Sequence, residues 1–181
     1  MGGFLSLGRK RRFERAGFEL YGAAVAAARD PVLYDRIGVP DTLDGRFDAI
    51  SLHVFLLIRR LNQEAEPGPT LAQAVFDAMF SDMDVNLREM GVGDMGVGRR
   101  NRAMWEALHG RAAAYTAAWD DDEALEAALA RNIWRGLSPN PGGPAALRRV
   151  ARMQEATLSA QDLATFRTGI ARYRPAMEAA A

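Results

Sequence analysis

The sequence contains no cysteine, and this absence removes several classes of chemistry. A chain of 181 residues without thiols cannot form disulfides, use a thiolate nucleophile or bind a metal through sulfur. There are only two histidines, His53 and His109, and they fall on different predicted helices. No serine stands in the sequence context of a nucleophile elbow. We therefore expect no metal, no cofactor and no catalytic residues.

The chain also lacks an excess charge and a long hydrophobic run. Its formal net charge is zero, so no overall field favours DNA or another polyanion. The most apolar segment, residues 50–58, is too short to cross a bilayer. Residues 1–12 combine a short apolar stretch with a basic run, the reverse order of a secretory signal. We expect a cytoplasmic protein with a flexible basic N-terminus over 1–12, or with weak ribosome or membrane-surface contact through that segment.

What the chain does contain is helical periodicity, because its apolar residues recur at spacings of three and four. The spacing predicts helices over residues 13–30, 44–62, 70–87 and 99–119, and a further helix that ends before Gly136. The second helix is apolar nearly all round, which is typical of a central helix. Thr70 followed by Gln73 resembles a capping box at the start of the third helix. Residues 120–123 are acidic and predict a helix N-terminus.

Breaks between these segments are rich in glycine or proline. Residues 33–41 predict an irregular connector, residues 138–144 predict a loop, and two shorter helices are expected after it. No segment alternates apolar and polar residues over the length of a strand. The sequence therefore predicts an all-α, single-domain bundle of about six to seven helices over residues 13–181.

The glycine-rich segment 91–98 contains the letters of a dinucleotide-binding motif. That motif requires a strand before the glycines, whereas a helix is predicted here, and Asp94 would repel a phosphate. The segment is therefore interpreted either as a turn between two helices or as an adaptable apolar contact surface. The second interpretation depends on its flanking methionine and valine side chains, because methionine packs readily against varied partners.

Charged residues before and after the glycines have an ordinary explanation and a functional one. Asp84 and Arg88 are four residues apart on a predicted helix and can form an ion pair. Arginines cluster at 9–15, 99–102 and 148–152. The clusters at 9–15 and 99–102 are either a solvated surface or a contact for RNA or an acidic protein, the basis of an alternative function as a ribosome- or RNA-associated adaptor.

Two segments resemble the ubiquinol–cytochrome c chaperone family. The first runs from Met79 to Asp84, and the second runs from Leu87 through the glycines to Arg100. Upstream, residues 34–35, 38–42 and 47–48, together with His53, occupy consistent positions. The resemblance is strongest over residues 34–137.

The resemblance implies a helical fold without catalytic activity. It implies an assembly factor that binds newly made cytochrome b and supports biogenesis of the respiratory bc1 complex, in the cytoplasm or peripheral to the inner membrane. We expect an apolar transmembrane segment of the client to lie against the third and fourth predicted helices and the glycine segment. The expected partner-binding residues are Asp82, Asp84, Met90, Val92, Asp94, Met95, Val97, Arg99 and Arg100.

Overall fold

Several helices of the chain begin or end beside a proline, a glycine or a capping side chain. The computed structural model describes the backbone of residues 3–91 and 93–180, and the side chains within these ranges except those of 3–10, 95 and 180. The long helices are α1 (Gly3–Ala28), α3 (Leu43–Asn62), α4 (Gly68–Glu89), α5 (Asp94–Ala118), α6 (Asp122–Leu129) and α7 (Gly143–Ser159). The short ones are α2 (Pro31–Asp35), the π-helical turn η1 (Ala130–Trp134), α8 (Leu163–Phe166) and α9 (Met177–Ala180). No strand occurs in these ranges, and the predicted all-α bundle of six to seven helices is confirmed.

Three helix starts follow from side-chain caps. Asp30 accepts a hydrogen bond from the Val32 amide, and Thr42 accepts one from the Gly45 amide. Asp121 accepts from the amides of residues 123 and 124, as the acidic segment 120–123 predicts. Each bond satisfies an amide that lacks a partner inside the helix.

The capping box predicted at Thr70 is wrong. Helix α4 begins two residues earlier, at Gly68, without a side-chain cap. The Thr70 hydroxyl donates instead to Glu66, and Gln73 donates along the helix to Asp77. The proline at the second helical position explains the early start, because its fixed φ angle suits a first turn.

Other boundaries also differ from the predictions. Helix α1 begins at Gly3 rather than at residue 13, and the expected irregular connector over 33–41 begins inside α2. Helix α7 extends over 17 residues and is not short. Helix α5 begins at Asp94, so only residues 90–93 connect it to α4. The side chain of Val97 on this first part of α5 is buried, which favours helix despite the glycines beside it.

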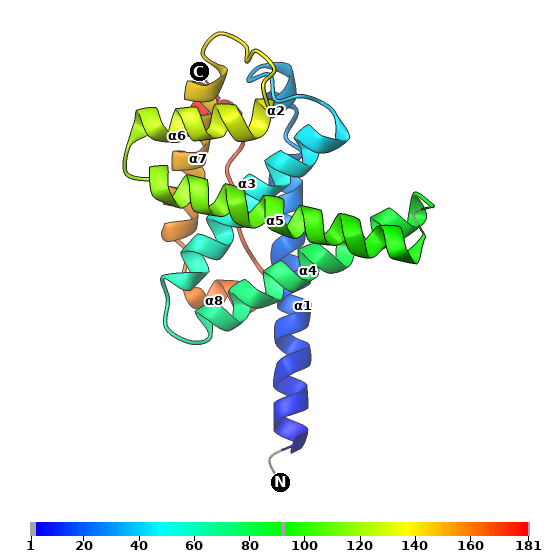
Figure 1. Cartoon of the computed structure of the whole chain (residues 1–181). Helices are drawn as coiled ribbons and strands as arrows, with labels where there is room; N and C mark the ends of the chain where they lie inside the picture. The colour runs from blue at the N-terminus through cyan, green and yellow to red at the C-terminus, as the bar shows by residue number, and fades with distance from the viewer. Residues whose placement is uncertain (1–2, 92, 181) are drawn as a thin grey trace.

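Helix α3 is the centre of the bundle, as its apolar sequence predicts. It packs against α1, α4, α5, α7 and η1. Its inward side chains Val54, Leu57 and Leu61 are fully buried. The five residues at i,i+4 spacing on α4 are also buried, from Leu71 to Leu87. In Figure 1 the bundle surrounds α3, while the first turns of α1 and the far ends of α4 and α5 extend away from it.

The core contains one buried charge network. Asp48 is fully buried on α3, and the Arg111 guanidinium of α5 lies 2.6 Å from its Oδ1 atom. Arg135 Nη2 donates to Oδ1 at 2.8 Å, and Arg135 Nε lies 2.7 Å from Oδ2. Burial raises the pKa of Asp48, and the two arginines oppose that rise. A buried carboxylate requires such partners, so the network fixes α3, α5 and the segment after η1 relative to one another.

His53 is a core residue and does not lie near a metal site. Its Nδ1 atom lies 2.8 Å from the Ala49 carbonyl oxygen, and its ring packs against Tyr173. Burial lowers the pKa of His53 because the imidazolium cannot be hydrated there.

Candidate functional site

A groove of about 700 Å³ lies between residues of the α4–α5 hairpin and residues of α1, α2 and α3. We call it the central groove. One wall consists of residues from α1, α2 and α3 and of Arg135. The other wall consists of the hairpin, defined as α4, residues 90–93 and α5. The two walls come from segments that are distant in sequence, so the groove exists only in the folded chain.

Apolar side chains dominate both walls of the central groove. Phe47 and Ile50 of α3 and Val25 of α1 lie on the bundle side. Four methionines lie on the hairpin side. They are Met79, Met83, Met90 and Met104. Met79 and Met83 are buried in the core, whereas Met90 is exposed and Met104 is half-buried, and unbranched thioether side chains at these last two positions can repack around ligands of different shape.

Exposed apolar side chains stand at the edges of the groove. Leu43 on α3 is 72% exposed, and Met90 at the end of α4 is 53% exposed. Both line the groove, on opposite walls. Large apolar groups that remain in water beside a concave apolar surface indicate a contact site for another molecule.

The polar residues of the groove lie among these apolar groups. The Tyr21 hydroxyl donates to Asp82 Oδ2 at 2.8 Å and joins α1 to α4. Burial raises the pKa of Tyr21, and the hydrogen bond to Asp82 adds to the effect. Arg29 and Arg100 line the groove, and within the described part of the chain neither forms an ion pair. Their guanidinium groups are therefore available to a ligand.

The far end of the hairpin is held by a polar cluster on its outer side. Asp84 accepts from Arg88 at 2.7 Å and from Asn101 of α5 at 2.9 Å. Arg88 also donates to Asp94, at the start of α5, at 2.5 Å. The Arg88 guanidinium holds the pKa of Asp84 below its usual range. We call these four residues the hairpin clamp, because they tie the end of α4 to the first turns of α5.

The structure divides the nine predicted partner-binding residues. Three of them line the central groove: Asp82, Met90 and Arg100. Asp84 and Asp94 belong to the hairpin clamp, and Arg99 is exposed on α5 outside the groove lining.

For the three remaining predicted residues, the structure describes no side chain at the protein surface. Val97 is only 2% exposed, so its side chain packs inside the protein and the expectation that it contacts a client is corrected. Val97 lies inside helix α5 rather than in a loop, and its position on the helix turns the side chain away from solvent. Val92 and the side chain of Met95 lie outside the described residues.

The bundle wall was not predicted from the sequence. Tyr21 and Val25 fall on the predicted helix 13–30 and Tyr34 falls on the predicted connector 33–41, and none of them was among the expected partner-binding residues. Phe47 and Ile50 belong by spacing to the same helix stripe as the buried Val54, so no local signal distinguished them as groove residues.

A metal site or a membrane span is not found in the described part of the chain. Glu106 stands three residues before His109, a spacing that occurs in metal sites. However, Glu106 accepts from Arg102, and His109 stacks on Trp105. No cluster of three potential ligands is present among the described side chains. None of the described helices is both long and apolar enough to cross a membrane.

The dinucleotide interpretation of the glycine segment is also excluded by the geometry. Helix α4 precedes the glycines, and Gly96 and Gly98 lie inside α5. Gly91 has a positive φ of 78°, as expected for the residue that reverses the chain after a helix.

Comparisons with known proteins match this chain to related proteins over almost its whole length. A family model described as ubiquinol–cytochrome C chaperone matches residues 35–173. The chain is 26% identical over 173 residues to the ubiquinol-cytochrome-c reductase complex assembly factor 1 of Xenopus laevis, covering 93% of this chain and 86% of that protein. The mouse (Mus musculus) protein of the same name is 25% identical over 173 residues, and the match covers 93% of this chain and 58% of the mouse protein. The crystal structure of the Cbp3 homolog from Brucella abortus is similar with a TM-score of 0.83 and 34% identity, covering 98% and 99% of the two chains.

Proposed function

Because this chain belongs to the ubiquinol–cytochrome C chaperone family, we propose that it binds newly made cytochrome b and holds an apolar segment of it in the central groove. The related vertebrate proteins are named as assembly factors of the ubiquinol–cytochrome c reductase complex. A transmembrane segment that has not yet met its neighbours exposes apolar surface to water, which favours aggregation. A chaperone for such a client must cover that surface and release it later.

The observation that carries the proposal is the apolar lining of the central groove between two helical walls. Recognition of a helix in a groove uses apolar anchors in the groove and polar contacts at its edge. The methionine-rich hairpin wall supplies the anchors, while Arg29, Arg100 and Asp82 supply the polar edge. A client that is a membrane protein also places this work at the surface of the inner membrane.

A purely binding role accounts for the polar residues better than catalysis does. Asp48 and His53, whose pKa values are shifted by burial, lie in the core and have structural partners there. Three carboxylates line the groove, of which Asp82 accepts from the Tyr21 hydroxyl and Asp44 pairs with Arg135. We therefore propose that the protein is not an enzyme.

The alternative role as a ribosome- or RNA-associated adaptor has less support. Several of the clustered arginines are already neutralised on the protein surface. Arg15 of the first cluster pairs with Glu19, and Arg102 of the second cluster pairs with Glu106. An arginine held by carboxylates is a poor phosphate ligand, because binding would first have to break these pairs.

Binding of cytochrome b to variants of the groove edge tests the proposed function. Leu43→Asp and Met90→Asp each place a carboxylate on an exposed apolar edge, and we expect at least about a tenfold loss of affinity for cytochrome b synthesised in a cell-free system without lipid. Val85→Asp is the matched control, because Val85 is 51% exposed on α4 and does not line the groove. Thermal melts by circular dichroism should be the same for all three variants. Unchanged binding by both edge variants would place the client elsewhere.

A further inference from the structure

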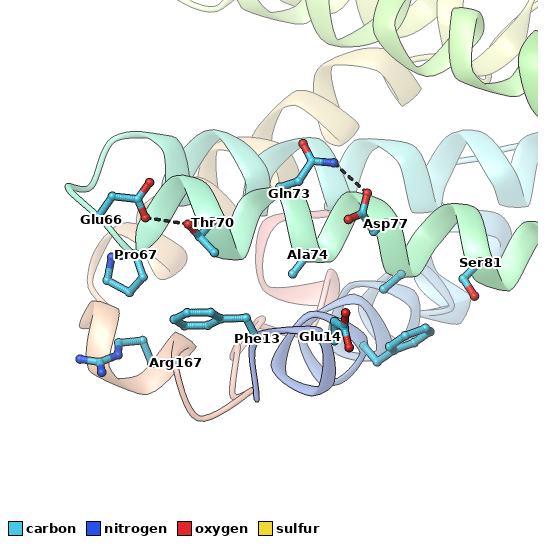
Figure 2. A pocket seen from close by; sticks show the side chains of 12 residues that line it. Phe13, Glu14, Glu66, Pro67, Thr70, Gln73, Ala74, Asp77, Ser81 and Arg167 are labelled. Atoms are coloured by element: carbon cyan, nitrogen blue, oxygen red, sulfur yellow. Dashed lines mark hydrogen bonds between the residues drawn. The ribbon is translucent and has the colours of Figure 1, made fainter. Parts of the chain in front are cut away.

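A second groove, of about 950 Å³, lies on another face of the molecule, between α1 and the first half of α4. We call it the lateral groove. Figure 2 shows Phe13 and Glu14 of α1 below the α4 residues Thr70, Ala74 and Asp77, with Arg167 at one end. Phe18 also lines it and is 50% exposed. The groove does not share a lining residue with the central groove.

The shape of the lateral groove follows from a close helix crossing. A Cβ atom added to Gly17 would lie 2.5 Å from the Ala74 carbonyl oxygen, so α1 and α4 touch backbone to backbone there. Small residues at a crossing allow this approach, and the helices separate on either side of it. The larger side chains beside the crossing, Phe13 and Phe18, are left at the open surface of the groove.

The lateral groove is acidic as well as apolar. Glu66 and Asp77 are exposed, and their hydrogen-bond donors are the neutral side chains of Thr70 and Gln73. The charges of these two carboxylates are therefore not cancelled by those donors. A ligand for this surface should combine apolar residues with positive charge.

The first turns of α1 carry that combination. Residues 9–12 are Arg, Lys, Arg and Arg, and they directly precede Phe13. Helix α1 extends beyond the other helices at this end (Figure 1). A short helical segment without a packing partner is marginally stable in water, so this extension gains stability from an external partner.

We propose that the lateral groove receives the first turns of α1 from a second copy of the chain, in a two-fold symmetric dimer. In such a dimer the two α1 helices run antiparallel, and each contributes the same surface to the other. Arg11 and Arg12 of one copy face the carboxylates of Glu66 and Asp77 of the other. The phenylalanines at positions 13 and 18 of both copies form the apolar centre.

Sedimentation equilibrium of the full chain, over a concentration series, tests the dimer. We expect twice the monomer mass of 19.8 kDa. The double variants Glu66→Arg/Asp77→Arg and Arg11→Glu/Arg12→Glu should each sediment as monomers, because like charges then meet at both contacts. Mixing the two variants should restore a 1:1 dimer, since each arm then finds a groove of opposite charge. Asp120→Arg, an exposed charge reversal away from both grooves, should dimerise like the parent chain.

Different outcomes of these measurements overturn the dimer itself or this placement of its interface. A parent chain that is monomeric at every concentration overturns the dimer, and dimerisation that survives both double variants overturns this placement of the interface. Variants that remain monomeric after mixing, while retaining the parent's circular dichroism melt, also overturn it. Phe18→Glu provides a second disruption that does not depend on the charge pairs. None of these measurements involves cytochrome b, so the dimer and the proposed function can fail independently.

Discussion

The Tyr21 hydroxyl donates a 2.8 Å hydrogen bond to the Asp82 carboxylate and so connects α1 to the hairpin at the central groove. The two residues are 61 positions apart in the sequence. Tyr21 is almost completely buried, and Asp82 is exposed at the edge. The contact therefore links the burial of α1 to the position of α4 in the hairpin wall.

A double-mutant cycle on this pair should show an interaction free energy. Tyr21→Phe and Asp82→Ala are each expected to lower the free energy of unfolding by roughly 1 kcal/mol, and the double variant should lose little more than either alone. Urea unfolding followed by circular dichroism measures all four proteins. Fully additive losses would show that the hydrogen bond does not contribute in solution.

Removing the charge of Asp48 should lower the free energy of unfolding much more than the substitutions of Tyr21 or Asp82. Asp48→Asn leaves Arg111 and Arg135 without their shared anion in the core, and we expect a loss of roughly 3 kcal/mol in the free energy of unfolding. Asp41→Asn is the matched control, because Asp41 pairs with Arg46 at the exposed surface. The control should unfold like the parent protein in the same urea titration, and equal losses in the two variants would contradict the structural role of the buried network.

The stability of the protein should fall in mildly acidic solution because of His53. Its pKa is lowered by burial in the folded state, so between about pH 6.5 and the lowered value only the unfolded chain takes up the proton. Above about pH 6.5 both states are neutral at this residue and the contribution is constant. Unfolding free energies measured by urea between about pH 7 and 5 should therefore decrease with falling pH.

Substitution of each histidine identifies the source of this dependence. His53→Asn keeps a donor near the Ala49 carbonyl oxygen but does not titrate, and it should flatten the profile above about pH 5. His109→Gln, on the surface of α5, should leave the profile as it is. A parent profile that is flat over this interval would show that His53 is protonated in the folded protein as easily as in the unfolded one.

The hairpin clamp should control local opening rather than global stability. Arg88→Ala removes the bonds from Arg88 to Asp84 and Asp94, and we expect faster amide hydrogen exchange over residues 94–101. Arg102→Ala removes an exposed ion pair within α5 itself and should not change exchange at the start of the helix. Equal exchange in the two variants would mean that the buried Val97 and Leu87 side chains alone hold the end of the hairpin.

Some helices could be predicted from the sequence better than others, because the local pattern that indicates a helix differs in strength between them. The spacing from Leu71 to Leu87 predicts both a helix and its buried face, because core packing and helical periodicity act on the same residues. The glycines at 96 and 98 predict a loop, yet they lie inside α5. The cost of about 1 kcal/mol for each glycine in a helix is small beside the packing of Val97.

The site was predicted on one side only. The hairpin wall is continuous in sequence, so Asp82, Met90 and Arg100 were found there. The bundle wall, with Val25 and Phe47, depends on contacts between helices that no local spacing specifies. Patterns along the chain can therefore indicate one face of a groove, whereas its opposite face depends on the tertiary arrangement.

Because the chain has no cysteine, the width of the central groove can be measured between two introduced labels, one on each wall. Leu43 and Met90 stand exposed on opposite walls, so cysteines introduced at these two positions would be the sole attachment points for nitroxide spin labels. Pulsed electron resonance between the labels then reports the width of the opening, with and without client.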